Sequence, residues 1–372
     1  MASLDEIAPG PGEVATHFSD QRAPTAAVDS ELTSPPTRAQ ETPAGAADEP
    51  FWRRALEFES NSVLVALIVM IVVIGGIHPD FFSRSAMLDI LQQSSYIAIM
   101  AGGMAFLISM REIDLSVGSM FGLTIVLAAL LMKAGVPPWV AGLMCIPFGA
   151  AMGLLNAGIV QGIKIPAIVA TLATLSLYRG LSMALTKGQQ VPNIPVGSSF
   201  FSVLGNRHLG VPSGVFALIA TAIVLSVVLR LTPFGYRVRG IGSNPDAATF
   251  SGISIPKVRI QALVLMGGLC GVAGVFGLAF FQSGDPNFGA GLELQVIAAA
   301  VIGGTPLRGG RATVAGAVFG AILLTVVNSG LIYFGIPINW SSFATGFVIL
   351  VAVSIDSLVR RRRRAGSSGL GL

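Results

Sequence analysis

Long apolar segments separated by short polar ones fill the chain after residue 50. A helix needs about 20 apolar residues to cross the hydrocarbon core of a bilayer, so the pattern predicts membrane-spanning helices. The predicted spans are 62–77, 90–110, 115–132, 139–160, 165–186, 212–231, 260–281, 292–301, 312–334 and 343–358. The eighth is short, which predicts a broken or partly re-entrant helix. The expected fold class is therefore all-α, a polytopic membrane protein of about ten transmembrane helices.

The distribution of basic residues predicts the orientation of these spans. If the N-terminus is cytoplasmic, sixteen Lys and Arg residues fall on the cytoplasmic side and four fall outside. Cytoplasmic loops of membrane proteins carry such an excess. An odd number of spans would move either the central basic loop or the Arg360–Arg364 run to the outside. The sequence thus favours an even number of spans, with both termini cytoplasmic.

Composition divides the chain into three parts. Residues 1–50 hold nine acids and two bases, so they carry a charge of about −7, whereas the rest carries about +11. This segment has no sustained apolar period and lacks the basic start and apolar core of a secretory signal. We expect a disordered acidic cytoplasmic tail at 1–50, a transmembrane domain at 51–360 and a basic, Gly/Ser-containing cytoplasmic tail at 361–372.

Amino-acid usage also excludes an ordinary soluble domain. The chain is 53% hydrophobic and only 11% charged, and its 45 glycines suit close helix crossings in lipid. The two cysteines, Cys145 and Cys270, both lie in apolar runs. They cannot form a disulfide framework and are expected to be core residues.

The longest polar interruption in the second half of the chain, residues 232–257, contains a short helix signal. Asn244 can cap the helix, Pro245 suits its first position, Asp246 faces the positive end of the helix dipole, and Gly252 can end it. Two interpretations remain open from this loop alone. It is either a lateral helix that a partner protein grips or a loop with a chance capping pattern.

Two further polar motifs lie at predicted span ends. In residues 111–118, the carboxylate of Asp114 enters a span, where it can cap the following helix, pair with Arg111 or act in transport. The second motif, residues 303–311, is rich in glycine and contains two arginines. Because no Gly-Lys-Ser/Thr sequence occurs anywhere in the chain, a tight anchored turn is favoured over a Walker phosphate loop.

Polar residues inside the spans could join helices or line a solute path. Arg179 is expected to reach the outer surface or to pair with a carboxylate such as Glu293. Neutral polar side chains suit an uncharged, hydroxylated solute, although they also join helices to one another. The possible path residues are Asn156, Thr171, Thr174 and Asn328.

Four segments together resemble a known family. They are IPAIVATLATLSLYRGL at 165–181, RVRGIGSNPDAATFSGI at 237–253, LELQVIAAAVIGGTPLRGGRATVAG at 292–316 and, after the second span, IDLSVGSM at 113–120. The sequence resembles the permease subunit of bacterial ABC importers of the ribose, xylose and galactose type, over roughly residues 55–360. One departure is that Arg111 and Glu112 stand where the family usually has glycines.

The resemblance implies a homodimeric permease in the bacterial cytoplasmic (inner) membrane that moves a monosaccharide or similar polar solute by alternating access. It implies three further partners: a cytoplasmic ATPase subunit, an extracytoplasmic sugar-binding protein and membrane lipid, with no nucleic acid. ATP and Mg²⁺ would act in the ATPase, so this chain should bind no cofactor or metal and hold no catalytic residue. The segment 187–211 would face the binding protein.

The resemblance also assigns roles to residues. The ATPase-coupling loop would comprise Arg237, Arg239, Gly240, Asn244, Pro245, Asp246, Phe250 and Gly252. The turns of the family motifs would comprise Asp114, Ser116, Gly118, Gly303, Gly304, Arg308, Gly309 and Gly310.

Two alternatives come from other functional classes. An ion-coupled secondary sugar transporter would need carboxylates or an ion site within the spans, but Asp114 and Glu293 both lie near predicted span ends. A channel would need no ATPase, which would leave the capped cytoplasmic helix unexplained.

Overall fold

The computed structural model of the chain describes residues 60–337, 340, 343–347 and 350, which are mostly helical. Both predicted tails and most of the tenth span lie outside the described residues. The elements are α2 (Ser60–Ile77), η1 (Pro79–Phe82), α3 (Arg84–Ser109), α4 (Val117–Lys133), α5 (Pro138–Leu143), α6 (Cys145–Ile163), α7 (Ala167–Thr186), α8 (Ser199–Leu204), β1 (Arg207–His208), β2 (Val211–Pro212), α9 (Ser213–Leu231), α10 (Pro233–Ser243), α11 (Pro245–Phe250), α12 (Ile255–Phe281), α13 (Leu292–Ile302) and α14 (Val314–Tyr333).

A helix covers each of the first nine predicted spans. Within the described part of the chain, six helical segments are long and apolar enough to cross a membrane, namely Arg84–Ser109, Pro138–Ile163, Ala167–Thr186, Ser213–Leu231, Ile255–Phe281 and Val314–Tyr333. Three apolar helices are shorter, namely Val63–Ile77, Val117–Lys133 and Leu292–Ile302. The structure therefore supports a multi-span helical membrane protein, while the count of ten spans stays a prediction.

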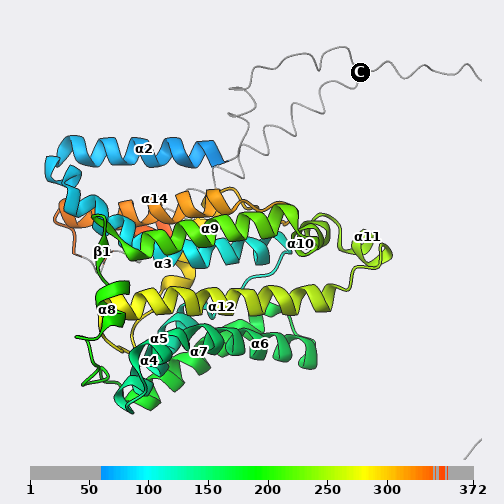
Figure 1. Cartoon of the computed structure of the whole chain (residues 1–372). Coiled ribbons are helices and arrows are strands. Elements are labelled where there is room, and N and C mark those ends of the chain that lie inside the picture. Colours follow the sequence, from blue (N-terminus) through cyan, green and yellow to red (C-terminus); the bar gives the residue numbers. More distant parts are fainter. Residues whose placement is uncertain (1–59, 338–339, 341–342, 348–349, 351–372) are drawn as a thin grey trace, which may run out of the picture. The chain divides into compact units, whose positions relative to one another are not determined.

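The long helices lie side by side and their connections gather at two ends (Figure 1). One end holds α10 and α11, and the other holds α8 and the short β1–β2 hairpin. Contacts between distant segments confirm each end. Arg111 bonds to Ser243 at the α10–α11 end, and Arg207 pairs with Asp89 at the β1–β2 end.

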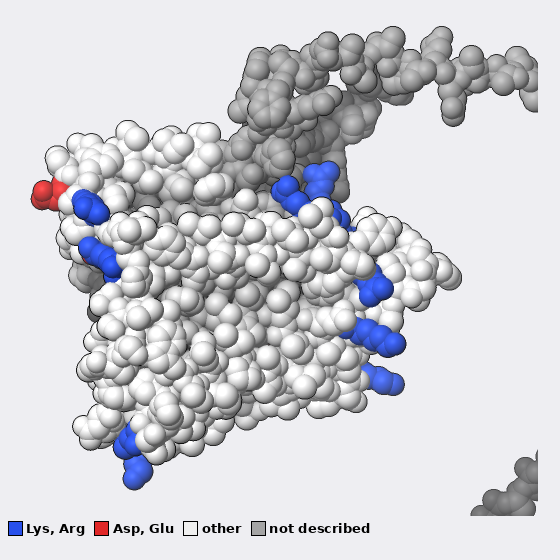
Figure 2. Space-filling view, viewed as in Figure 1, with Lys and Arg blue, Asp and Glu red and all other residues white. Residues whose placement is uncertain are grey.

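Lys and Arg residues gather at these two ends of the bundle. Figure 2 shows Lys and Arg at the ends of the helices, with the wall between them free of charged side chains on the face in view. In the described part of the chain, the α10–α11 end carries Arg111, Lys164, Arg230, Arg237, Arg239, Lys257, Arg259, Arg308 and Arg311. The opposite end carries Arg84, Lys133, Lys187 and Arg207, and the remaining basic residue, Arg179, lies within α7. An uncharged wall between two charged ends is the arrangement that a bilayer requires.

Helix α3 lies at the centre of the bundle. It contacts α9, α12, α13 and α14, and 89% of its most apolar 18-residue stretch is buried inside the protein. Its mean hydropathy of 1.2 is the lowest of the six candidate spans. Because α3 faces other helices, it can carry polar residues such as Gln92, Ser94 and Ser95, all of which are buried.

Helices α7 and α9 form the opposite case. Only 28% of the most apolar 18-residue stretch of each helix is buried, and large apolar side chains cover the outer faces of both helices. These include Leu172 and Leu177 on α7 and Ile223 and Val224 on α9, each more than half exposed. Such surfaces would be unstable in water and are stable in lipid, so these faces are the lipid-contacting wall or an interface with another membrane chain.

Helices α6 and α12 cross most closely, and glycines make this approach possible. Gly149 and Gly153 of α6 face Gly267 and Gly271 of α12. A Cβ atom added at any of the four would overlap the backbone of the facing helix. This arrangement agrees with the expectation that the glycines serve close helix crossings.

Replacing Gly267 by alanine should therefore destabilise the protein, because neither backbone can yield as a flexible side chain would. We expect a loss of about 1–3 kcal/mol in unfolding free energy, the range typical of overpacking. Gly268→Ala is the matched control, since an added Cβ there meets nothing within 4 Å. Thermal unfolding of the purified protein should separate the two variants, and equal melting temperatures would contradict the close crossing.

Two helices differ from the predicted spans for local reasons. Helix α3 begins at Arg84, before the apolar run starts at residue 90, because the Ser83 side chain caps it by accepting from the Ala86 N–H. Helix α13 has only 11 residues, in agreement with a broken eighth span, and at about 1.5 Å per residue it covers about half of a bilayer core.

Candidate functional site

The first candidate site is α11, at the tip of the α10–α11 end. The Asn244 side chain accepts from the N–H groups of Asp246 and Ala247, at 3.1 Å each, so the predicted cap is formed. Pro245 opens the helix and Gly252 follows its end with a φ of +80°. The predicted short helix is thus present, with the predicted boundaries.

Helix α11 stands out from the bundle. It contacts mainly α10 and, to a smaller extent, α12. Ala248 is the buried residue of this helix. Phe250, in contrast, is 92% exposed. A phenylalanine held at the tip of a capped helix, and left uncovered by the described part of its chain, suits insertion into a groove of a partner.

The coupling-loop residues before α11 lie on α10. Arg237 is exposed, whereas Arg239 is half-buried and donates from Nε to the Gly235 carbonyl at 3.4 Å. Gly240 accepts from the Asn244 N–H and so closes α10 directly before the cap of α11. The predicted loop is therefore two consecutive helices joined at Asn244.

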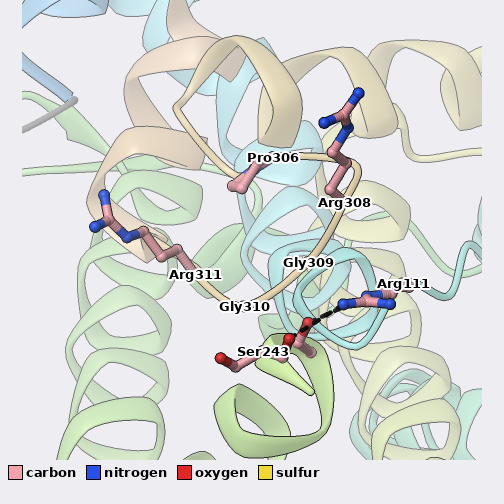
Figure 3. Close-up of a pocket in the computed structure, with 8 residues that line it drawn as sticks. Arg111, Ser243, Pro306, Arg308, Gly309, Gly310 and Arg311 are labelled. Carbon is pink, nitrogen blue, oxygen red and sulfur yellow. Dashed lines mark hydrogen bonds between the residues drawn. The ribbon is translucent and has the colours of Figure 1, made fainter. Parts of the chain in front are cut away.

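The end of α3 holds the end of α10. Arg111 donates from Nε to the Gly242 carbonyl at 3.1 Å and from a terminal nitrogen to the Ser243 carbonyl at 3.2 Å (Figure 3). The N–H of Gly310 donates to the Ser109 carbonyl at 2.9 Å, which brings the α13–α14 connection to the same point. Three segments far apart in the sequence therefore meet where α3 ends.

These segments line an open cleft of about 360 Å³. Arg308 and Arg311 extend to opposite sides of the α13–α14 connection, and Arg111 points to Ser243 (Figure 3). Gly304, Gly309 and Gly310 all have positive φ, as a tight turn requires. A Cβ at Gly303 would overlap Gly316 at the start of α14. The prediction of an anchored turn is confirmed for this motif.

A second contact lies beside Arg111. Glu112 forms an ion pair with Arg259 in the first turns of α12, and the two side chains are 14% and 28% exposed. Burial raises the pKa of the Glu112 carboxyl, and the charge of Arg259 opposes that rise. The sequence interpretation missed this pair, because nothing in the spacing of 112 and 259 shows that the two segments meet.

The second candidate site is a buried polar cluster around Asp114, which is fully buried. Asp114 Oδ1 accepts from the Ser116 N–H at 2.8 Å and from Ser116 Oγ at 2.6 Å. Asn156 Nδ2 donates to Ser116 Oγ at 2.8 Å and approaches Asp114 Oδ2 at 3.3 Å. Asp114 therefore closes the turn that leads into α4, but α4 itself begins after Ser116 with no side-chain cap, so the predicted capping of that helix by Asp114 is wrong.

The alternative pairing of Asp114 with Arg111 is wrong. Arg111 has a φ of +65°, in the left-handed region, and its side chain reaches the end of α10 rather than Asp114. The carboxylate is held by neutral donors instead. Those donors replace the water that would otherwise solvate it, which is what a buried charge requires.

One face of helix α7 supplies further polar residues to the cluster. Thr171, Thr174 and Tyr178 are spaced by three and four residues, so they share a face, and all three are buried. Thr171 Oγ1 accepts from the Leu115 N–H at 3.1 Å, and the Tyr178 hydroxyl lies 2.9 Å from Asn156 Oδ1. Thr174 donates to the Thr171 carbonyl. Tyr178 was missed, although its helical spacing from the two threonines could have revealed it.

Two other predicted residues lie apart from this cluster. Gly118, in the first turn of α4, packs against Gly289 and against the side chain of Glu293. Asn328 lies on α14, whose neighbours are α2, α3, α9 and α13. Glu293 Oε2 and Asn328 Oδ1 are buried and have no hydrogen-bond partner among the described residues. The predicted path residues therefore lie in two places. Asn156, Thr171 and Thr174 lie in the cluster around Asp114, and Asn328 lies on α14.

The expected pairing of Arg179 with Glu293 is also wrong. Both residues are described, and no ion pair joins them. Glu293 instead sits in the first turn of α13, beside Gly118 of α4. A carboxylate there faces the positive end of its own helix dipole, which offsets part of the cost of its burial.

The remaining sequence expectations concern cysteines and metals. Cys145 and Cys270 are free and buried, as expected of core residues. Across the described residues, no group of three or more His, Cys, Asp or Glu side chains is placed to hold a metal ion.

Comparison with known proteins gives one family and a consistent set of relatives. A family model described as the permease component of branched-chain amino acid transport systems matches residues 86–353. The ribose import permease protein RbsC of Escherichia coli K12 is 35% identical over 309 residues, which cover 82% of this chain and 96% of the relative. No solved structure matches the chain.

Two further relatives are a second ribose permease and an autoinducer 2 permease. RbsC of Bacillus subtilis strain 168 is 32% identical over 292 residues, which cover 78% of this chain and 91% of the relative. The autoinducer 2 import system permease protein LsrC of Salmonella typhi is 33% identical over 309 residues, with coverage of 82% and 88%. The region that the family model matches, residues 86–353, includes both candidate sites.

Proposed function

Because this chain belongs to the family of ABC importer permease components that contains the ribose and autoinducer 2 permeases, we propose that it carries a monosaccharide or similar polar solute across the bacterial inner membrane. It is a multi-pass membrane subunit, and the family it belongs to is that of permeases rather than ATPases. ATP and Mg²⁺ would be used by a separate ATPase subunit.

The observation that carries the coupling role is the exposed, capped helix α11. Phe250 at 92% exposure and Asp246 in the first turn offer an apolar anchor and a charge on one short rigid element. We assign the ATPase-docking role to α10 and α11. The cap matters because a helix of six residues is unstable alone and must be ordered before it can dock well.

We place the α10–α11 end in the cytoplasm, with ten spans and both termini inside. Nine basic residues of the described chain lie at that end and four lie at the other, and cytoplasmic loops carry such an excess. A reporter fused after Gly242 should therefore read as cytoplasmic and one fused after Lys187 as external. A cytoplasmic signal at both positions would mean that α9 does not cross the membrane.

Two further partners complete the proposed importer. A second copy of the chain would contribute the other half of the path, and the exposed apolar walls of α7 and α9 are available for lipid or for that copy. A sugar-binding protein would dock at the opposite end. The segment 187–211 there presents the β1–β2 turn, with Leu209 96% exposed.

Within the membrane, the unpartnered oxygens of Glu293 and Asn328 are better suited to contact a sugar than the Asp114 cluster. The polar atoms of Asn156 and Thr171 are already engaged in holding the turn before α4. A hydroxylated solute offers O–H donors, and buried oxygens that lack a donor gain most from them. We therefore shift the proposed path from Asn156, Thr171 and Thr174 toward Asn328, with Glu293 added.

The deciding experiment is reconstitution of the chain in liposomes with a candidate ABC ATPase and a candidate sugar-binding protein from the same organism. Uptake of radiolabelled ribose or a related sugar should require ATP and all three components. Uptake driven by a proton gradient without the ATPase would indicate a secondary transporter instead. Flux that is independent of ATP would indicate a channel.

A further inference from the structure

The connection between α3 and α4 contacts the chain on both sides of α11. Arg111 reaches the last two carbonyls of α10, those of Gly242 and Ser243. The next residue, Glu112, reaches Arg259 in the first turns of α12. One dipeptide thus contacts the chain immediately before α11 and shortly after it.

The backbone of this dipeptide is fixed. Helix α3 ends with the N–H of Arg111 bonded to the Ile108 carbonyl and the N–H of Glu112 bonded to the Leu107 carbonyl, both at 2.9 Å. With Arg111 in the left-handed region, this is the Schellman ending of a helix, a position that glycine normally occupies. An arginine there carries a conformational cost, and its side-chain contacts with α10 offset that cost.

The same connection leads directly into the buried cluster. Asp114 follows Glu112 by two residues, and its carboxylate closes the turn into α4. The Leu115 N–H is held by Thr171 of α7. A displacement of Arg111 or Glu112 must therefore move a short segment that is hydrogen-bonded at both ends and whose second end lies inside the bundle.

The contact to α12 is also protected from solvent screening, whereas the Arg111 side chain is exposed. Glu112 and Arg259 are mostly buried, so their attraction is weakened less by salt than that of an exposed pair. Arg111 places its charge at the C-terminal end of α10, where the helix dipole favours a cation.

From this geometry we infer that Arg111, Glu112 and Arg259 are positioning residues that transmit movement of α11 to the Asp114 turn inside the membrane. The inference rests on the proposed function, because it requires an ATPase that moves α11. It adds the route by which that movement enters the bundle. None of the three residues is proposed to touch the ATPase or the solute.

The test uses the reconstituted importer and measures sugar imported per ATP hydrolysed. Glu112→Gln and Arg259→Gln should each lower this ratio about tenfold while co-purification with the ATPase stays at the wild-type level. Arg259→Lys, which retains the charge, should restore much of the ratio. Lys133→Gln is the control, since it removes an exposed charge in the last turn of α4, at the opposite end and outside the segment 187–211, and should leave the ratio unchanged.

Arg111→Gly provides a second variant if the glutamine variants fail to fold. It relieves the left-handed backbone while it removes the contacts with α10, so the protein should remain folded and lose coupling. The inference is overturned if the variants keep the wild-type ratio, or if they lose ATPase binding in proportion to uptake. A wild-type importer that shows no ATP-dependent uptake would refute the proposed function instead.

Discussion

Replacing Asp114 by alanine should unfold the connection between α3 and α4 and abolish uptake. The change removes the acceptor for the Ser116 N–H, the Ser116 hydroxyl and one interaction of Asn156. Each buried donor left without an acceptor costs about 1–3 kcal/mol, so the total loss in unfolding free energy should be about 3 kcal/mol or more. The cost is high because Asp114, Ser116 and Asn156 are all buried, which keeps the freed donors away from bulk solvent.

Two variants separate the causes of this loss. Asp114→Asn keeps one oxygen acceptor and removes a buried charge, so it should cost less than the alanine change. Asp89→Ala removes an exposed carboxylate, 55% accessible in its pair with Arg207, and should cost at most about 1 kcal/mol. Thermal unfolding in detergent measures all three. An Asp114→Ala protein that melts with the wild type would show that the cluster does not hold the turn.

Replacing Phe250 by alanine should release the ATPase without disturbing the permease. The side chain is 92% exposed, so its removal leaves no cavity in this chain. If it fills a groove of the ATPase, the loss should be about 1–3 kcal/mol in binding, which is roughly a 5- to 150-fold weaker complex. Asp246→Lys should weaken the complex as well, since it places a cation at the positive end of α11.

Leu209→Ala is the matched control for Phe250. Leu209 is 96% exposed at the β1–β2 turn of the opposite end, so its replacement removes an apolar side chain of equal exposure. Co-purification with the ATPase should fall for Phe250→Ala and Asp246→Lys and stay unchanged for Leu209→Ala. If both α11 variants co-purify with the ATPase at the wild-type level, α11 is only a capped loop and has no docking role.

The sequence predicted those features that depend on neighbouring residues. Apolar length predicted helices over the first nine spans, and the Asn244, Pro245 and Gly252 pattern predicted α11 with its boundaries. The number of glycines indicated close helix crossings, and α6 and α12 supply one. Each of these signals acts within a few turns of the chain, where local preferences decide the structure.

The partners of charged residues could not be predicted in the same way. Arg111 and Asp114 are close in sequence, yet the left-handed backbone at Arg111 directs its side chain to α10. Asp114 instead meets Asn156 across 42 residues. Glu112 meets Arg259 for the same reason, because helix contacts rather than sequence distance decide which side chains meet. Sequence spacing therefore located the candidate residues and misassigned their contacts.

The burial of α3 also constrains how the protein is made. Helix α3 leaves the ribosome long before α12, which begins at Ile255, and before α13 and α14, which together with α9 surround it. At a synthesis rate of about 5–20 residues per second, the delay until α12 emerges is on the order of ten seconds. During that interval Gln92, Ser94 and Ser95 lack the neighbours that later bury them. The least apolar span thus waits for neighbours that are made much later, so we expect a nascent chain that stalls before α12 to leave polar side chains in lipid and to become a substrate for membrane proteases.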